Sequence, residues 1–193
     1  MGNTKSTMNI AIGEEAKAAW EAGVPEAGIE MLDSLVYQFG ATDLSDTILR
    51  VKSLDPDVLF LLANTNDAIL WTRQMQELDY YPKMGIVNLG GGFLDPTYLE
   101  TVGPDAANGI VVTTDWLPQI NLSGSEEVAA EFRDATGMRI SGMNATYATM
   151  WLLKDALEQA CSTDPQELAE VLRTTTFEEG QWDFMWNTVE FQE

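Results

Sequence analysis

Short apolar runs alternate with helical spacings over the first 114 residues, and this alternation constrains the fold more than any other feature of the chain. The run at 57–63 (DVLFLLA) is continuous and is bounded by Asp55-Pro56 and Asn64, which is typical of a strand buried on both faces of a parallel sheet. Further strands are predicted at four positions, 8–12, 29–39, 83–89 and 109–114. This order predicts an α/β fold with an open parallel sheet and flanking helices.

Cap and stop signals locate the helices between these strands. Gly23 and Pro25 are expected to end the helix that starts near Gly13. Helix N-caps are predicted at Asp43, Asn66 and Asp95. Pro96 follows Asp95 as the first helical residue, and Gly103 is expected to end this short helix.

The pattern changes after about residue 120. Ser123 and Glu126 have the spacing of a capping box, and helices are predicted from there to Gly137, at 144–160 and from Asp164 onward, with no strand between them. The helix at 144–160 has apolar residues on more than one face, so we expect it to be buried on several sides. The aromatic tail at 181–191 (QWDFMWNTVEF) predicts a final strand or hairpin.

Charge and composition exclude several classes of function. The chain has 31 acidic and 10 basic residues and a net charge of −21, which disfavours nucleic acid and anionic membrane surfaces as partners. It has no histidine and one cysteine, Cys161, so no internal disulfide, catalytic residue, metal site or cofactor is expected. The first fifteen residues have no long apolar stretch, so no secretory signal is expected, and no apolar run approaches the ~20 residues of a membrane span.

Four strings resemble the receptors of branched-chain amino-acid ABC transporters, which are type 1 periplasmic solute-binding proteins. In chain order they are FGATDLSDTILRVKSLDPDVLFLLA, MGIVNLGGGFLDPTYLETVG, the helix pair EEVAAEFRDATG and NATYATMWLLKDALEQA, and DPQELAEVLRTTTF followed by TVEF. The resemblance covers the C-terminal part of a full member. It implies two α/β lobes joined by a hinge, with ligand bound in the cleft between them.

The resemblance also implies a division of this chain. Residues 1–114 with 181–193 would form the second lobe of the family, and residues 115–180 would form the hinge crossing and the helical part of the first lobe. The sheet of that first lobe has no counterpart here, which would account for the strongly apolar helix at 144–160.

Ligand contacts in this family come from loops at the carboxyl ends of strands. The resemblance therefore implies candidate ligand-binding residues in two loops, a crossing segment and one helix start: Asn64, Thr65, Asn88, Gly90, Gly91, Trp116 and Asn144. Trp116 either walls the cleft or packs in the hinge, and Asn144 is either a cleft residue or a helix cap. The glycines either let the backbone approach a ligand or meet the needs of a turn. Asp67 and Asp115 are possible partners for a ligand's ammonium group.

Two functions remain open at this point. The first is the solute-binding component of an ABC importer, with a small molecule such as an amino acid as ligand, a membrane permease as partner and a periplasmic location. The second is a sensor or assembly module that forms a homodimer through exposed first-lobe helices. A third function, an enzyme on an α/β scaffold, is disfavoured because the chain has no histidine and no nucleophile constellation.

Overall fold

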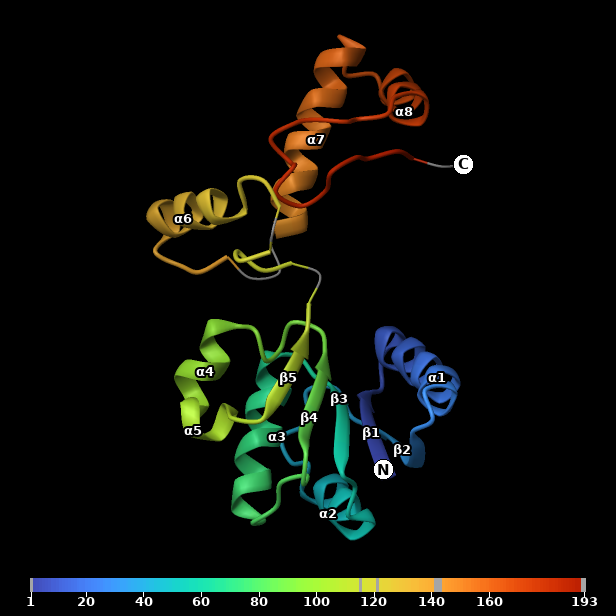
Figure 1. Cartoon of the computed structure of the whole chain (residues 1–193), viewed down its shortest axis with the longest axis vertical. Coiled ribbons are helices and arrows are strands. Elements are labelled where there is room, and N and C mark those ends of the chain that lie inside the picture. Colours follow the sequence, from blue (N-terminus) through green and yellow to red (C-terminus); the bar gives the residue numbers. More distant parts are fainter. Residues whose placement is uncertain (1, 115, 121, 141–143, 192–193) are drawn as a thin grey trace. The chain divides into compact units, whose positions relative to one another are not determined.

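The computed structural model describes residues 2–114, 116–120, 122–140 and 144–191, which divide into two compact units, Met1–Thr114 and Asp115–Glu193. Figure 1 shows the strands gathered in the first unit, while the second is drawn as helices and extended segments. Within the described residues, no helix is both long enough and apolar enough to cross a membrane.

The first unit is built on a parallel sheet, as predicted. Its strands are β1 (Gly2–Met8), β2 (Glu30–Tyr37), β3 (Val58–Leu62), β4 (Gly85–Leu89) and β5 (Ile110–Thr113), in the order β2-β1-β3-β4-β5. All four pairings are parallel. All carboxyl ends therefore lie along one edge of the sheet, which is the edge where open α/β sheets bind ligands.

Helices cover both faces of this sheet. They are α1 (Ala11–Glu26), α2 (Ser45–Leu54), α3 (Thr65–Glu77), α4 (Pro96–Val102) and α5 (Pro104–Ala107). Side chains alternate along a strand, so Phe60 of β3 points away from Leu59 and Leu61 and meets Trp20 of α1 at 5.8 Å between ring centres. On the other face Leu59 and Leu61 are fully buried in the core that includes Trp71 of α3.

The first strand and the first helix differ from the prediction. β1 ends at Met8 instead of running from Met8 to Ile12, and α1 already begins at Ala11. Its buried side chains before Met8, which are Thr4, Ser6 and Thr7, are polar and give no apolar signal. Burial comes from the neighbouring strands β2 and β3, which pair with β1 on its two sides.

α1 also ends later than expected. It continues through Gly23 and Pro25, and the chain turns at Gly28, where φ is +73°. A proline in the last turn removes one hydrogen-bond donor, and the turn is closed by backbone hydrogen bonds from Ala27 to Gly23 and from Gly28 to Pro25.

The second unit consists of α6 (Ser125–Thr136), α7 (Asn144–Ala160) and α8 (Pro165–Thr174), followed by a hairpin-like tail in its described part. Phe177 and Val189 form an antiparallel bridge with two backbone hydrogen bonds of 2.9 Å each. α8 begins where predicted, and Asp164 caps it by accepting the N–H groups of Gln166 and Glu167. For α6 the N-cap is Gly124 without a side-chain bond, so the predicted Ser123–Glu126 box is not formed.

Two expectations for the second unit differ from the structure. Residues 181–193 were assigned to the first unit, yet Trp182 and Phe184 are buried in a core with Ala148 and Leu152 of α7. α7 is buried along one face only, since Met150 on another face is 59% exposed. The aromatic tail covers one side of the helix, and no other described element of this unit covers the side of Met150.

Candidate functional site

Two loops at the carboxyl edge of the sheet pack directly against each other. One follows β3 and leads into α3, and the other follows β4 and holds Gly90, Gly91 and Gly92. A β-carbon on Gly92 would lie 2.3 Å from the carbonyl oxygen of Ala63 and 2.6 Å from the carbonyl carbon of Asn64. Glycine at 92 therefore allows the two candidate ligand-binding loops to meet.

Asn64 and Thr65 form the start of α3. Asn64 is the N-cap residue, with φ −77° and ψ 176°, and its Oδ1 accepts the N–H of Asp67 at 2.8 Å. The predicted cap, Asn66, lies instead in the first turn and is exposed. Capping uses Oδ1 of Asn64 and leaves its Nδ2 group as a donor. The backbone N–H groups of Thr65 and Asn66 have no partner inside the helix and sit at the positive end of its dipole.

Asn88 was expected in the loop after β4 but lies within that strand, whereas Gly90 and Gly91 follow it. Asn88 is fully buried, and its Nδ2 donates to the carbonyl oxygen of Leu61 at 2.9 Å, so its side chain joins β4 to β3. Gly90 and Gly91 are exposed. Gly90 has φ +101°, a conformation that favours glycine, whereas a β-carbon on Gly91 would meet no atom within 4 Å.

The remaining candidates belong to the second unit. Trp116 is 5% exposed, and its Nε1 donates to the carbonyl oxygen of Phe184 at 2.7 Å, which favours the packing alternative over a cleft wall. Asn144 is the first residue of α7, but its side chain lies outside the described residues, as does Asp115. The structure thus brings together Asn64, Thr65, Gly90 and Gly91 in one unit.

A buried pair beside these loops was not anticipated. Asp67 is 1% exposed, too buried to reach a solute's ammonium group, and its Oδ2 lies 3.4 Å from the hydroxyl of Tyr37. The same hydroxyl lies 2.9 Å from the carbonyl oxygen of Leu62. Burial raises the pKa of the Asp67 carboxyl, although a hydrogen bond from the backbone of Gly40 opposes this. The sequence suggests Asp67 as a partner for an ammonium group, but no local pattern pairs it with Tyr37, which lies thirty residues away.

Metal ligands are not clustered in the part of the chain that the structure describes. No group of three or more His, Cys, Asp or Glu side chains there could hold a metal ion. Cys161 is exposed, and its Sγ contacts the carbonyl oxygen of Glu158 at 3.3 Å.

Comparison with known proteins gives one family. The profile of a family described as periplasmic binding protein matches residues 7–188. Among curated proteins, the Leu/Ile/Val-binding protein homolog 7 of Brucella abortus (strain 2308) is 28% identical over 172 residues. The match covers 83% of this chain and 41% of that protein, so the chain spans less than half the length of this relative.

Solved structures show the same fold at lower identity. The leucine-, isoleucine-, valine-, threonine- and alanine-binding protein from Brucella ovis aligns with a TM-score of 0.78 at 18% identity, over 99% of this chain and 48% of the other. A fatty acid ABC transporter substrate-binding protein from Thermomonospora curvata aligns with a TM-score of 0.81 at 16% identity, over 98% and 49%. The comparisons do not support the homodimer required by the sensor or assembly hypothesis.

Proposed function

We propose, from the premise that this chain belongs to the periplasmic binding protein family, that it binds a branched-chain or related amino acid as part of the solute receptor of an ABC importer. The name of the Brucella abortus relative and the ligands named for the Brucella ovis protein support this ligand class. Structural relatives with other ligands, such as a fatty acid, share the fold, so the choice of ligand depends on the residues at the site.

One observation carries the proposal: the loops after β3 and β4 meet at Gly92 and together present a set of hydrogen-bond donors. Nδ2 of Asn64 and the free N–H groups at the start of α3 suit the carboxylate of an amino acid, because a helix N-terminus favours anions. Gly90 and Gly91 have no side chains to block the approach of a ligand to the backbone.

The proposed mechanism breaks no bond. The solute binds at these loops while the cleft between two lobes is open, the lobes close over it, and a membrane permease recognises the closed form. We place this cycle in the periplasm because the family is named for that compartment. Asn144 stays a proposed ligand-binding residue.

The test is calorimetric binding and thermal unfolding of the full chain with leucine, isoleucine, valine, other amino acids, amides and small carboxylates. Binding to the native state stabilises it by RT ln(1 + L/Kd), where L is the concentration of free ligand, so the Tm rises with the logarithm of the ligand concentration above Kd. We expect leucine, isoleucine or valine to raise the Tm, and a flat response across the whole panel would contradict the proposal.

The Asn64→Asp variant tests the site itself. Aspartate caps a helix as well as asparagine does, so α3 should keep its start, but the donor is replaced by a carboxylate oxygen that repels the solute's carboxylate. We expect binding to weaken about tenfold or more, since a charged hydrogen bond contributes roughly 1.5–3 kcal/mol. The matched control is Asn108→Asp, which makes the same charge change just before β5. This position lies at the end of the sheet where the strands begin, opposite the carboxyl ends that carry the candidate loops. Equal loss of affinity in both variants would argue against contact at Asn64.

A further inference from the structure

The first unit has a cavity at the end of the sheet where the strands begin, opposite the candidate solute loops. It has a volume of about 630 Å³ and lies where β4 and β5 begin, next to Gly85 and Gly109. This volume is within the range of small-molecule sites in proteins. Its walls come from α3, from the segment that joins α3 to β4, and from α5. Neither the proposed amino-acid site nor its loops contribute to it.

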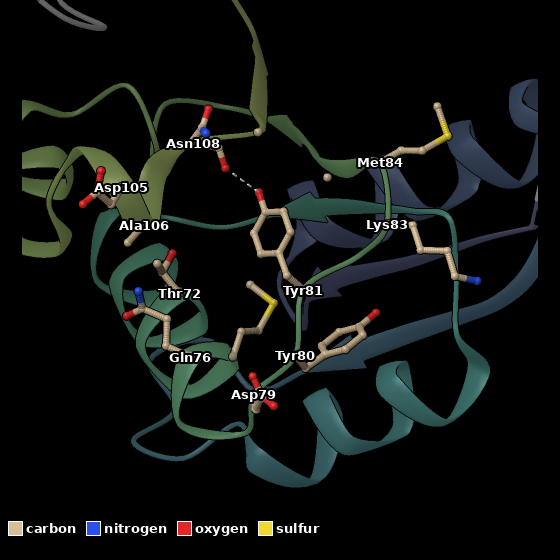
Figure 2. Close-up of a pocket in the computed structure, with 13 residues that line it drawn as sticks. Thr72, Gln76, Asp79, Tyr80, Tyr81, Lys83, Met84, Asp105, Ala106 and Asn108 are labelled. Carbon is tan, nitrogen blue, oxygen red and sulfur yellow. Dashed lines mark hydrogen bonds between the residues drawn. The ribbon is translucent and has the colours of Figure 1, made fainter.

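Tyr81 forms the centre of this cavity. Its hydroxyl donates to the backbone carbonyl oxygen of Asn108 at 3.0 Å, which fixes the ring beside the start of β5 (Figure 2). Partial burial raises the pKa of Tyr81 to about 12, so the phenol is neutral at physiological pH. The side chain is 41% exposed. The ring therefore offers an accessible aromatic surface whose orientation is held by a hydrogen bond.

The charges at the cavity are negative. Figure 2 shows Asp105 above and to the left of Tyr81 and Asp79 below it, with Gln76 of α3 in between. Within the described residues, neither carboxylate forms an ion pair. Lys52 lies near Asp79, but its Nζ donates to the backbone carbonyl oxygens of Leu78 at 2.8 Å and of Asp79 at 3.3 Å.

The basic residue at the rim does not neutralise these carboxylates. Lys83 bonds Asp55 at 2.7 Å and lies 3.9 Å from Asp57, and its side chain points away from Tyr81 in Figure 2. The net charge of −21 over the whole chain adds to the local negative potential.

These features match one chemical class of ligand. An ammonium group would be attracted by the two carboxylates and by the face of the Tyr81 ring, because an aromatic face attracts cations. The apolar part of such a ligand would contact the ring, Met75 and Ala106, which also line the cavity. An anion would meet two carboxylates that form no ion pair within the described residues. We infer that this cavity binds a small organic amine with an apolar body, independently of the amino acid proposed for the opposite end of the sheet.

Isothermal calorimetry on the full chain with phenethylamine tests this inference. Two probes of similar shape, 2-phenylethanol and 3-phenylpropanoate, replace the ammonium by a neutral and by a negative group. We expect the amine to bind and both analogues to bind at least about tenfold more weakly, because only the amine gains the charge contacts. Absence of binding by the amine, or equal binding of all three probes, would overturn the inference.

Substitutions locate the bound amine. Asp79→Asn with Asp105→Asn should weaken binding about tenfold. Asparagine tolerates the positive φ of +47° at position 79, and circular dichroism would verify the fold. The matched control is Asp46→Asn with Asp134→Asn, which removes the same total charge at two exposed positions outside the cavity. If the control pair lost as much affinity as the cavity pair, the attraction would be a property of the whole surface, and the site would be refuted.

Discussion

At the residue scale, the contact between Tyr37 and Asp67 links the loops of the proposed solute site to pH. The phenol has one hydrogen, and its nearer acceptor is the carbonyl oxygen of Leu62, at 2.9 Å against 3.4 Å for Asp67 Oδ2. A protonated Asp67 could donate to the phenol oxygen while Tyr37 donates to Leu62, so that both groups are satisfied. Burial is the largest influence on the pKa of Asp67 and raises it, against the hydrogen bonds from Gly40 and Tyr37, which lower it.

This pair predicts how stability depends on pH. A carboxyl group whose pKa is raised in the folded state binds its proton more tightly there than in the unfolded chain, where it titrates near about 3.9. Its contribution to the free energy of unfolding is therefore complete below about pH 4 and is lost as the pH rises through the folded pKa. We expect Asp67→Asn to gain stability relative to the wild type as the pH is raised from about 4 to 8, in urea titrations at each pH. A profile for Asp67→Asn that runs parallel to that of the wild type would contradict the assignment.

At the scale of elements, the approach of the β3–α3 loop to the β4–α4 loop depends on the missing side chain at position 92. Gly92→Ala would put a β-carbon 2.3 Å from the carbonyl oxygen of Ala63, so the loops must separate. We expect a loss of about 1–3 kcal/mol in the free energy of unfolding by urea denaturation, as for other overpacked sites. Gly91→Ala is the neighbouring control, since its β-carbon would meet nothing within 4 Å, and it should change stability little. Equal stability of the two variants would show that the loops do not depend on this contact.

At the scale of the whole molecule, the charge of −21 is a source of self-repulsion. There are 31 acidic residues against 10 basic ones, and the ion pairs between described residues lie at the surface, where each contributes little. Salt screens repulsion over distances beyond about 10 Å at 0.1 M.

We therefore expect the Tm to rise between about 10 mM and about 300 mM NaCl, measured by differential scanning calorimetry. Sodium sulfate at the same ionic strength separates screening from the exclusion of sulfate from the protein surface, which would raise the Tm further. A Tm that stays constant or falls with NaCl would show that attractive pairs outweigh the repulsion.

The sequence by itself determined the elements whose signals are local. The apolar run of β3, the Asp95–Pro96 start of α4 and the Asp164 cap of α8 each need only a few neighbouring residues, and the structure has all three. The parallel α/β class followed from the order of such elements, because parallel strands need helical crossovers.

The tertiary structure decided what depends on distant partners. β1 is a central strand because β2 and β3 pair with it, although its own residues are mostly polar. Asn64 and Asn66 are the same type of residue, and only the backbone at the end of β3 settled which of them caps α3 and which stays in the turn. The side chains of Asn88 and Trp116 are buried because each N–H group has a carbonyl acceptor inside the protein. Asn88 donates to Leu61, and Trp116 donates to Phe184. These partners are separated by 27 and 68 residues, so they do not affect the local periodicity of the sequence. The spacing of residues therefore cannot predict such hydrogen bonds.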